Sequence, residues 1–192
     1  VESAVAAATL LDRCMAGDAE FESLLSGDTV FVAALGASDL HADAFSAVQA
    51  HGDDTTVRLQ GTLNAVPLGA DPDAWLIPAT LDAAAAWCLV TTKAKGINIE
   101  PRLLSDGTYN ARLTFNDSEA QVLANGDQAH AAQHAARIAA ELASSAYQLG
   151  LAETLFAMTC DYVGTRRQFG QAIGSFQSLQ HRLVDAYLAL RL

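Results

Sequence analysis

The sequence predicts an α+β fold, in which a small antiparallel β-barrel or sandwich domain is flanked by helices. Three observations predict this class. Residues 1–28 carry apolar residues at helical spacing, residues 29–125 alternate short β-type runs with turn signals, and residues 126–192 return to helical spacing. We therefore expect the end of an N-terminal helical region over 1–28, a middle β-domain over 29–125, and over 126–192 the first two helices of an incomplete C-terminal bundle.

The composition is that of a globular protein, with 51% hydrophobic and 17% charged residues in a chain of 192. No apolar run reaches the roughly 18 residues that a membrane-spanning helix needs, and the N-terminus lacks the basic start of a secretory signal. We therefore expect a cytoplasmic protein. Because the sequence starts with Val and both ends fall inside helical patterns, we also expect an excerpt of a longer protein.

The net charge of −11 argues against general binding to nucleic acids or anionic membranes, because both need basic patches. Beyond residue 165, however, Asp185 is the only acid, and the basic residues there are Arg166, Arg167, Arg182 and Arg191. A basic corner on an acidic protein suits a small anionic ligand, whereas cations placed to suit helix dipoles would explain one or two of the four. The three cysteines have no short spacing and predict neither a disulfide framework nor a zinc site.

The first expected element is a helix over residues 1–15, which Gly17 ends. Its apolar positions are Val5, Ala8, Leu11 and Met15. The period changes after the turn at Ser26–Asp28, and residues 29–35 form a β-type apolar run. This run is the expected entry to the β-domain.

The β-domain is expected to consist of short strands between turns, which favours an antiparallel barrel or sandwich over a parallel sheet with crossover helices. The candidate strands are 55–59, 63–66, 75–77, 87–92, 97–100 and 109–115. The turn signals between them are 51–54, 69–72 and 105–107. Residues 125–127, Asn-Gly-Asp, end the sheet region.

Two helices are expected after it. The first runs from about Ala129 to Arg166, and its apolar stripe is Ile138, Leu142, Leu149, Ala152, Phe156, Cys160 and Val163. A turn from Gly170 to Gly174 follows, Ser175 is the expected N-cap, and the second helix continues to the end of the chain. Two such stripes need further helices or another subunit to cover them.

Several polar groups are candidates for chemistry, each with a simpler explanation. His130 and His134 have the i, i+4 spacing of metal ligands, but no third ligand is evident, and the first turn of an exposed helix explains them better. The carboxylate pairs 53–54 and 71/73 lie in turn-like stretches, where Asp is favoured because it hydrogen-bonds the backbone.

The segment from Arg166 to Gln180 has a more particular pattern. Two guanidinium groups at a helix end, backbone amides freed by glycines, and Phe176 with Gln177 at the next helix start are suited to gripping a pyrophosphate and covering a ring. A structural turn with a solvated arginine pair explains the same residues. The residues alone favour neither interpretation.

These residues carry a resemblance to a known family. The sequence Arg-Arg-Gln-Phe-Gly at 166–170, Phe176-Gln177, and Gln-His-Arg-Leu at 180–183 resemble the junction of the first two helices of the C-terminal bundle in acyl-CoA dehydrogenases. Residues 57–62 and 73–79 resemble that family's middle β-domain. The resemblance covers most of the chain and is strongest over about 140–190.

The resemblance implies a flavoprotein of lipid or sterol catabolism that dehydrogenates an acyl-CoA between its α and β carbons, FAD accepting the hydride. It implies an oligomer, homomeric or with a homologous subunit, in which one subunit's segment binds its neighbour's FAD, and possible transfer of electrons to an acceptor flavoprotein. By position, Arg166 meets the FAD phosphates. The other implied cofactor-binding residues are Gln168, Phe169, Phe176 and Gln177.

The sequence departs from the family at several positions. The β-domain reads Ala-Val-Pro at 65–67 where the family has a Trp-Ile-Thr or Trp-Ile-Ser flavin contact, and the usual Thr-Glu loop is not recognisable near 35–39. The substrate-contacting arginine of the first bundle helix aligns near Glu141, with Arg137 one turn away, and the usual catalytic Glu lies beyond Leu192. We therefore expect either a dehydrogenase or the degenerate partner subunit of one. The alternative is a non-catalytic structural or interaction protein with the same fold.

Overall fold

The computed structural model describes residues 2–14, 18–35, 45–68 and 71–191. The expected N-terminal helix is present as α1 (Glu2–Arg13), while Met15 and Gly17 lie outside the described residues. A second helix, α2 (Asp18–Ser26), was not predicted. Its apolar face consists of little more than Phe21 and Leu24, which are half-buried against the core, and this is too short a stripe to show a helical period.

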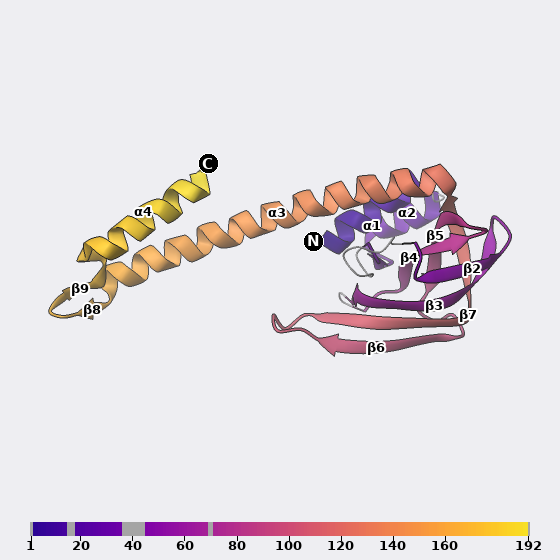
Figure 1. The fold of residues 1–192 in the computed structure, drawn as a ribbon, viewed down its shortest axis with the longest axis horizontal. Coiled ribbons are helices and arrows are strands. Elements are labelled where there is room, and N and C mark those ends of the chain that lie inside the picture. Colours follow the sequence, from indigo (N-terminus) through magenta and orange to yellow (C-terminus); the bar gives the residue numbers. More distant parts are fainter. Residues whose placement is uncertain (1, 15–17, 36–44, 69–70, 192) are drawn as a thin grey trace. The chain divides into compact units, whose positions relative to one another are not determined.

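The middle of the chain forms a sheet that closes on itself (Figure 1). Its strands are β1 (Phe31–Ala33), β2 (Val48–Gly52), β3 (Thr56–Pro67), β4 (Ala74–Leu81), β5 (Ala84–Thr91), β6 (Ile97–Leu103) and β7 (Tyr109–Asn125). Strands β4, β2, β3, β7 and β5 pair in a ring that β4 and β5 complete. The predicted barrel is therefore confirmed, with β1 and β6 attached to β4 and β7.

The prediction of a purely antiparallel sheet is wrong in two places. Strand β4 pairs in parallel with β1, where Val32 lies opposite Trp75, and in parallel with β2, where Gln49 lies opposite Thr80. Both pairings join strands far apart in the sequence. Local turn signals reveal hairpins, but they carry no information about such pairings.

Several strand boundaries also differ from the prediction. The two short strands expected at 55–59 and 63–66 are one strand, β3, whose pairing with β7 shifts register after Leu59 and after Leu63. Gly61 follows the first irregularity and Ala65 lies within the second, and both residues interrupt the alternating pattern that identifies a strand. Strand β2 falls partly in the predicted turn at 51–54, since only residues 53–55 separate β2 from β3.

Two strands, β4 and β6, are longer than predicted, and each contains a proline, which argues against a strand in the sequence. Pro78 lies inside β4, opposite Trp87 of β5. On the other side of β4, the pairing with β1 ends at Leu76 and the pairing with β2 starts at Thr80, so Pro78 falls between these two pairings. Pro101 lies in β6, which pairs only with β7. A proline lacks the N–H that a ladder needs and is tolerated at such unpaired edges.

The part of the chain that contains the barrel, residues 1–141, is called the barrel unit here and has two apolar cores. The first fills the barrel, and its largest members are Trp75, Leu59, Leu63, Ile77, Leu113 and Phe115. The second lies between the sheet and the helices, where Leu10 and Leu11 of α1 meet Trp87 and the buried alanines of the first turns of α3 (Gly126–Thr165). The alanines Ala129, Ala132 and Ala136 are fully buried, because a small side chain lets the helix backbone approach the sheet closely.

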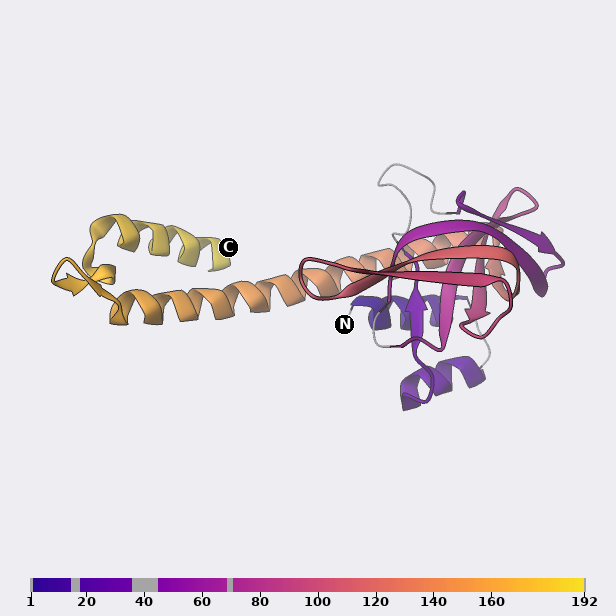
Figure 2. The same cartoon turned by 90° about the horizontal axis from the view of Figure 1, so that it is seen from below.

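The chain divides into two compact units, Val1–Glu141 and Leu142–Leu192. The second unit contains the rest of α3, a small hairpin of β8 (Arg167–Gln168) and β9 (Gln171–Ala172), the 3₁₀ turn η1 (Ile173–Ser175) and α4 (Gln177–Arg191). Helix α4 runs back beside the C-terminal half of α3 (Figures 1 and 2). The two predicted bundle helices are therefore confirmed.

The partial exposure of the α3 stripe agrees with the prediction that two helices alone cannot cover it, whereas the N-cap of α4 differs from the prediction. Along the α3 stripe only Ala152, Phe156, Cys160 and Val163 are half-buried, and the rings of Phe156 and Tyr187 are 6.1 Å apart. Ile138, Leu142 and Leu149 are at least half exposed. Ser175 is not the N-cap of α4, because it ends η1 and its hydroxyl donates to the Ala172 carbonyl, 2.7 Å away. The N-cap position is instead occupied by Phe176, whose carbonyl accepts hydrogen bonds from the N–H groups of Leu179 and Gln180.

Candidate functional site

The turn after α3 is a two-residue hairpin loop. Gln168 pairs with Gln171 across it, and the two residues between them, Phe169 and Gly170, have φ angles of +53° and +79°. Positive φ at both central positions is the pattern of a type I′ turn, which favours Asn-Gly or Gly-Gly. A phenylalanine in this place holds its backbone in the left-handed region at a cost of about 1–3 kcal/mol.

The ring of Phe169 is also almost fully exposed, at 92%. Its aromatic neighbour is Phe176, whose ring lies 6.2 Å away at an interplanar angle of 82°. Because the Phe169 backbone is strained and its ring is open to solvent, this residue contributes little to the apolar core of its own unit. The two rings instead form an edge-to-face pair shortly before α4, which is called the aromatic step below.

The backbone of Arg166 is held by two hydrogen bonds, whereas its side chain is exposed. Its N–H donates to the Tyr162 carbonyl and its carbonyl accepts from the Ile173 N–H, and each N···O distance is 2.8 Å. Its side chain is exposed, as is that of Arg167, and neither guanidinium is ion-paired with another described residue. Two positive charges without a counterion therefore lie in sequence just before the aromatic step.

The glutamines differ in availability. The Gln168 side-chain amide donates to the Arg167 carbonyl at 2.8 Å and is thus used within the hairpin. Gln177 is exposed on the first turn of α4. Gln180 donates to the Gly174 carbonyl at 3.0 Å and ties α4 to η1. Arg166, Phe169, Phe176 and Gln177 could therefore contact an anion with an attached ring, while Gln168 contributes to the shape of the turn.

The β-domain positions that resemble the family's flavin contact lie at a bulge in β3. Ala65 has φ +56° and is exposed, while Val66 is fully buried in the barrel core. Pro67 is half-buried and has no N–H to donate. This stretch therefore offers a methyl group and a pyrrolidine ring, with no indole and no hydroxyl. The expected loop at 36–39 lies outside the described residues.

The remaining sequence candidates have structural roles in the fold. Asp53 accepts three hydrogen bonds from Thr55 and Thr56, which lower its pKa to about 2, and Asp73 accepts from the Val30 N–H at 2.9 Å. His130 packs its ring 5.2 Å from Phe45. Within the described ranges, no group of three or more His, Cys, Asp or Glu lies close enough together to hold a metal ion.

Arg137 and Glu141, the two positions near the family's substrate arginine, bind each other at 2.8 Å. Burial raises the pKa of Cys14 to about 11 and that of Cys88 to about 12, so both thiols are protonated and structural. In the described part of the chain, no helix combines the length and the apolar character needed to cross a membrane.

One feature was missed by the sequence analysis. A cavity of about 680 Å³ lies against β3, β5 and β7 of the barrel unit. It is lined by Thr56, Arg58, Leu89, Thr91, Ala94, Lys95, Glu119, Ala120 and Gln121. Its lining residues on β7 lie beyond Phe115, where the predicted strand ended.

Comparison with known proteins agrees with this arrangement. A family model described as "Acyl-CoA dehydrogenase, C-terminal domain" matches residues 135–192. Acyl-CoA dehydrogenase FadE27 of Mycobacterium tuberculosis is 32% identical over 144 residues, which are 75% of this chain and 38% of that protein. The chain thus spans well under half of this curated relative.

Solved structures cover nearly the whole chain. The ChsE4-ChsE5 complex from Mycobacterium tuberculosis matches 98% of this chain and 51% of the other with a TM-score of 0.83 and 30% identity. A chain of the Tcur3481-Tcur3483 steroid ACAD matches 97% of this chain and 51% of the other, with a TM-score of 0.81 and 27% identity. A closed barrel followed by the start of a helical domain therefore defines an acyl-CoA dehydrogenase-like fold. The chain belongs to the acyl-CoA dehydrogenase family.

Proposed function

We propose that this chain is part of an FAD-dependent acyl-CoA dehydrogenase, acting on the α,β bond of an acyl-CoA thioester, or of the degenerate partner subunit of one. In this proposal, residues 166–177 contribute to an FAD site that a homologous subunit completes. The observation that carries it is the exposed Phe169 ring, held in a strained turn beside Phe176 and after two unpaired arginines. The Phe169 ring and both arginine side chains are exposed and fit a ligand supplied from outside the chain.

The residues present fit the pyrophosphate end of FAD. Arg166 has a fixed backbone and a free guanidinium, which can donate two parallel hydrogen bonds to phosphate oxygens. Phe169 and Phe176 offer a ring edge and a ring face for stacking, and Gln177 offers an amide donor and acceptor. When bound, FAD would accept the hydride from the substrate's β carbon. These side chains would hold and orient it.

The fit is poor at the flavin-ring position of this chain's own β-domain. Ala65 provides no aromatic surface, and Pro67 provides no backbone donor. We therefore propose that the chain supplies cofactor contacts to a neighbour more fully than it holds a cofactor itself. We propose that the catalytic base, a Glu in the family, lies on a later helix beyond Leu192.

The relatives support a partner subunit. ChsE4-ChsE5 is described as a complex, and Tcur3481-Tcur3483 as a steroid ACAD of two named components. By analogy, we propose a hetero-oligomer with a homologous subunit, an acyl-CoA with a sterol-derived or other lipid acyl group, and an acceptor flavoprotein for the electrons. Fold-level analogy suggests these, and the side chains described above do not specify them.

Turnover of acyl-CoA is the test. The full protein is assayed alone and after co-expression with a homologous subunit from the same source, with an artificial electron acceptor reporting oxidation. We expect activity only in the pair, and we expect Arg166→Ala in this chain to lower it. Activity of the pair that is identical with and without the Arg166 side chain would contradict the proposal.

The second candidate function is a non-catalytic structural or interaction protein with this fold. The Ala-Val-Pro sequence at 65–67 favours it, since it removes flavin contacts while keeping the strand. The two functions differ in the co-expression experiment. A structural protein would assemble with its partner and leave the partner's flavin content and turnover unchanged when residues 166–177 are altered.

A further inference from the structure

The cavity of about 680 Å³ on the barrel has the size and lining of a small-ligand site. All of its lining residues belong to the barrel unit. None of them is among the residues assigned above to the cofactor or to substrate. Its apolar floor consists of the half-buried Leu89 and Ala94, while Ala120 borders it but is buried in the barrel core. The remaining lining residues carry hydroxyl, amide and charged groups.

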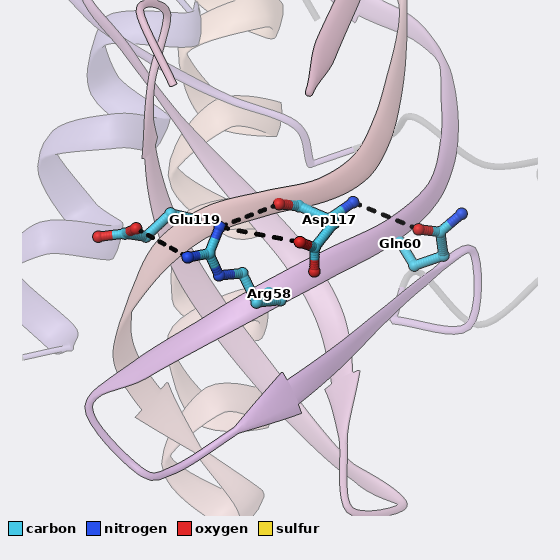
Figure 3. A network of polar contacts seen from close by, with 4 residues as sticks. All are labelled: Arg58, Gln60, Asp117 and Glu119. Atoms are coloured by element: carbon cyan, nitrogen blue, oxygen red, sulfur yellow. Dashed lines mark hydrogen bonds and ion pairs between the residues drawn. The ribbon is translucent and has the colours of Figure 1, made fainter. Parts of the chain in front are cut away.

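One cation of the cavity is held in place by the neighbouring strand (Figure 3). The Arg58 guanidinium donates to the Asp117 carbonyl at 3.2 Å and lies 3.3 Å from the Glu119 carboxylate. Figure 3 shows it extended from β3 across β7 between these two residues, with the Gln60 side chain accepting from the Asp117 N–H at 3.3 Å. The side chain is half exposed, at 51%, so its remaining N–H groups can reach a ligand. Its position therefore needs little reordering on binding.

The other cation lies on a turn that is fixed against the barrel. Lys95 stands in the connection from β5 to β6, next to Gly96, whose carbonyl accepts from the Asn116 N–H at 2.9 Å. A Cβ atom at Gly96 would lie 2.1 Å from the Asn116 carbonyl oxygen, so the turn touches β7 directly. Lys95 has no ion-pair partner in the described part of the chain. Its ammonium is therefore available to an anion.

The lining residues carry a net charge of +1, from Arg58, Lys95 and Glu119, and Arg58 also lies 4.0 Å from the carboxylate of Asp117, which is not a lining residue. This contrasts with the net charge of −11 for the whole chain. The neutral polar groups are the hydroxyls of Thr56 and Thr91 and the amide of Gln121, all exposed. A compact ammonium with several neutral donors around it suits the oxygens of a phosphate group, which accept many hydrogen bonds. The cavity is larger than a phosphate alone, so an organic group would rest on the apolar floor.

We infer that this cavity binds a phosphate monoester about the size of a nucleoside monophosphate. Its phosphate binds between Lys95 and Arg58, and its organic part packs on Leu89 and Ala94. This inference does not depend on the proposed dehydrogenase function, because it uses none of residues 166–177.

The test is titration of the full protein with adenosine monophosphate, followed by calorimetry and by amide chemical shifts of Ala94 and Gln121. We expect saturable binding with a Kd of about 1 mM or tighter. Lys95→Ala should weaken it roughly five- to tenfold. Glu119→Gln should tighten it by several-fold, because the substitution removes one of the two carboxylates that compete for Arg58.

The matched control is Lys93→Ala, which removes the same charge from the same turn at an exposed residue outside the lining. It should leave the affinity unchanged. Equal weakening by Lys93→Ala and Lys95→Ala would mean that bulk charge attracts the ligand and would overturn the inference. Adenosine binding as tightly as its monophosphate would show that the phosphate is not recognised, and inorganic phosphate binding as tightly would show the same for the organic part. Either result, or absence of saturation at about 10 mM, would also overturn it.

Discussion

Phe169 and Phe176 place their rings 6.2 Å apart at nearly right angles, although Phe169 is 92% exposed and has φ +53°. Phe169 lies in the loop of the hairpin between β8 and β9, and Phe176 lies between the 3₁₀ turn η1 and α4. A strained backbone persists only where something else selects it, and such positions cluster at ligand clamps. This pair is therefore the structural basis for assigning residues 166–177 to a ligand.

Phe169→Asn should separate stability from cofactor binding. Asparagine tolerates the left-handed region and Asn-Gly is the preferred type I′ sequence, so the substitution relieves strain. We expect thermal unfolding of the protein to be unchanged or shifted upward, and flavin retention in the assembly with a homologous subunit to fall. A mutant that keeps its flavin would show that the ring has no contact with the cofactor.

Arg166→Ala should weaken flavin retention in the assembly by about 1.5–3 kcal/mol, the usual contribution of a hydrogen bond to a charged group. Flavin dissociation is measured by fluorescence on dilution. Arg102→Ala is the control, since it removes an exposed cation of β6 and changes the net charge equally. The same loss in both mutants would point to a general charge effect and contradict a direct contact.

Much of the fold follows from local patterns in the sequence. The long helix and the presence of a turn after it were predictable, because periodicity and glycine signals are local. The parallel pairings of β4 were not, since they depend on which distant strands meet. The unity of β3 was hidden by the bulge at Ala65, where a non-glycine residue adopts φ +56° without any turn signal.

The candidate site shows the same division. The residues of the segment 166–177 could be selected from sequence, and the resemblance gave them a role. The use of Gln168 within its own hairpin and the exposure of Phe169 required coordinates. The cavity near Lys95 was unpredictable because it depends on three strands that meet only through tertiary pairing.

Gly96→Ala should destabilise the barrel much more than Gly107→Ala. Both glycines have nearly the same backbone, with φ of +83° and +84°, but a Cβ at Gly107 would meet nothing within 4 Å. The Gly107 substitution should therefore cost only the left-handed penalty, about 1–2 kcal/mol, and Gly96→Ala should add a clash with the Asn116 carbonyl. Urea unfolding of both mutants measures the difference. Equal destabilisation would contradict the close contact between this turn and β7.

The pH dependence of stability should show the role of Asp53. Its pKa is lowered from 3.8 to about 2 by hydrogen bonds from Thr55 and Thr56, so it binds its proton more weakly in the folded state. Its stabilisation is therefore complete above about pH 4 and is lost as the pH falls through about 2. Relative to Asp53→Asn, the wild-type protein should lose stability between these values, as measured by denaturant unfolding at each pH. Parallel curves for both proteins would argue against these hydrogen bonds.

The stoichiometry of FAD per chain in the purified full protein, expressed alone and with a homologous subunit, tests the central proposal most directly. If the chain contributes only part of an FAD site that a homologous subunit completes, the protein expressed alone should be colourless. The pair should then contain FAD in proportion to the complementary subunit. A yellow homo-oligomer that holds one FAD per chain when expressed alone would contradict this account and identify a self-sufficient flavoprotein.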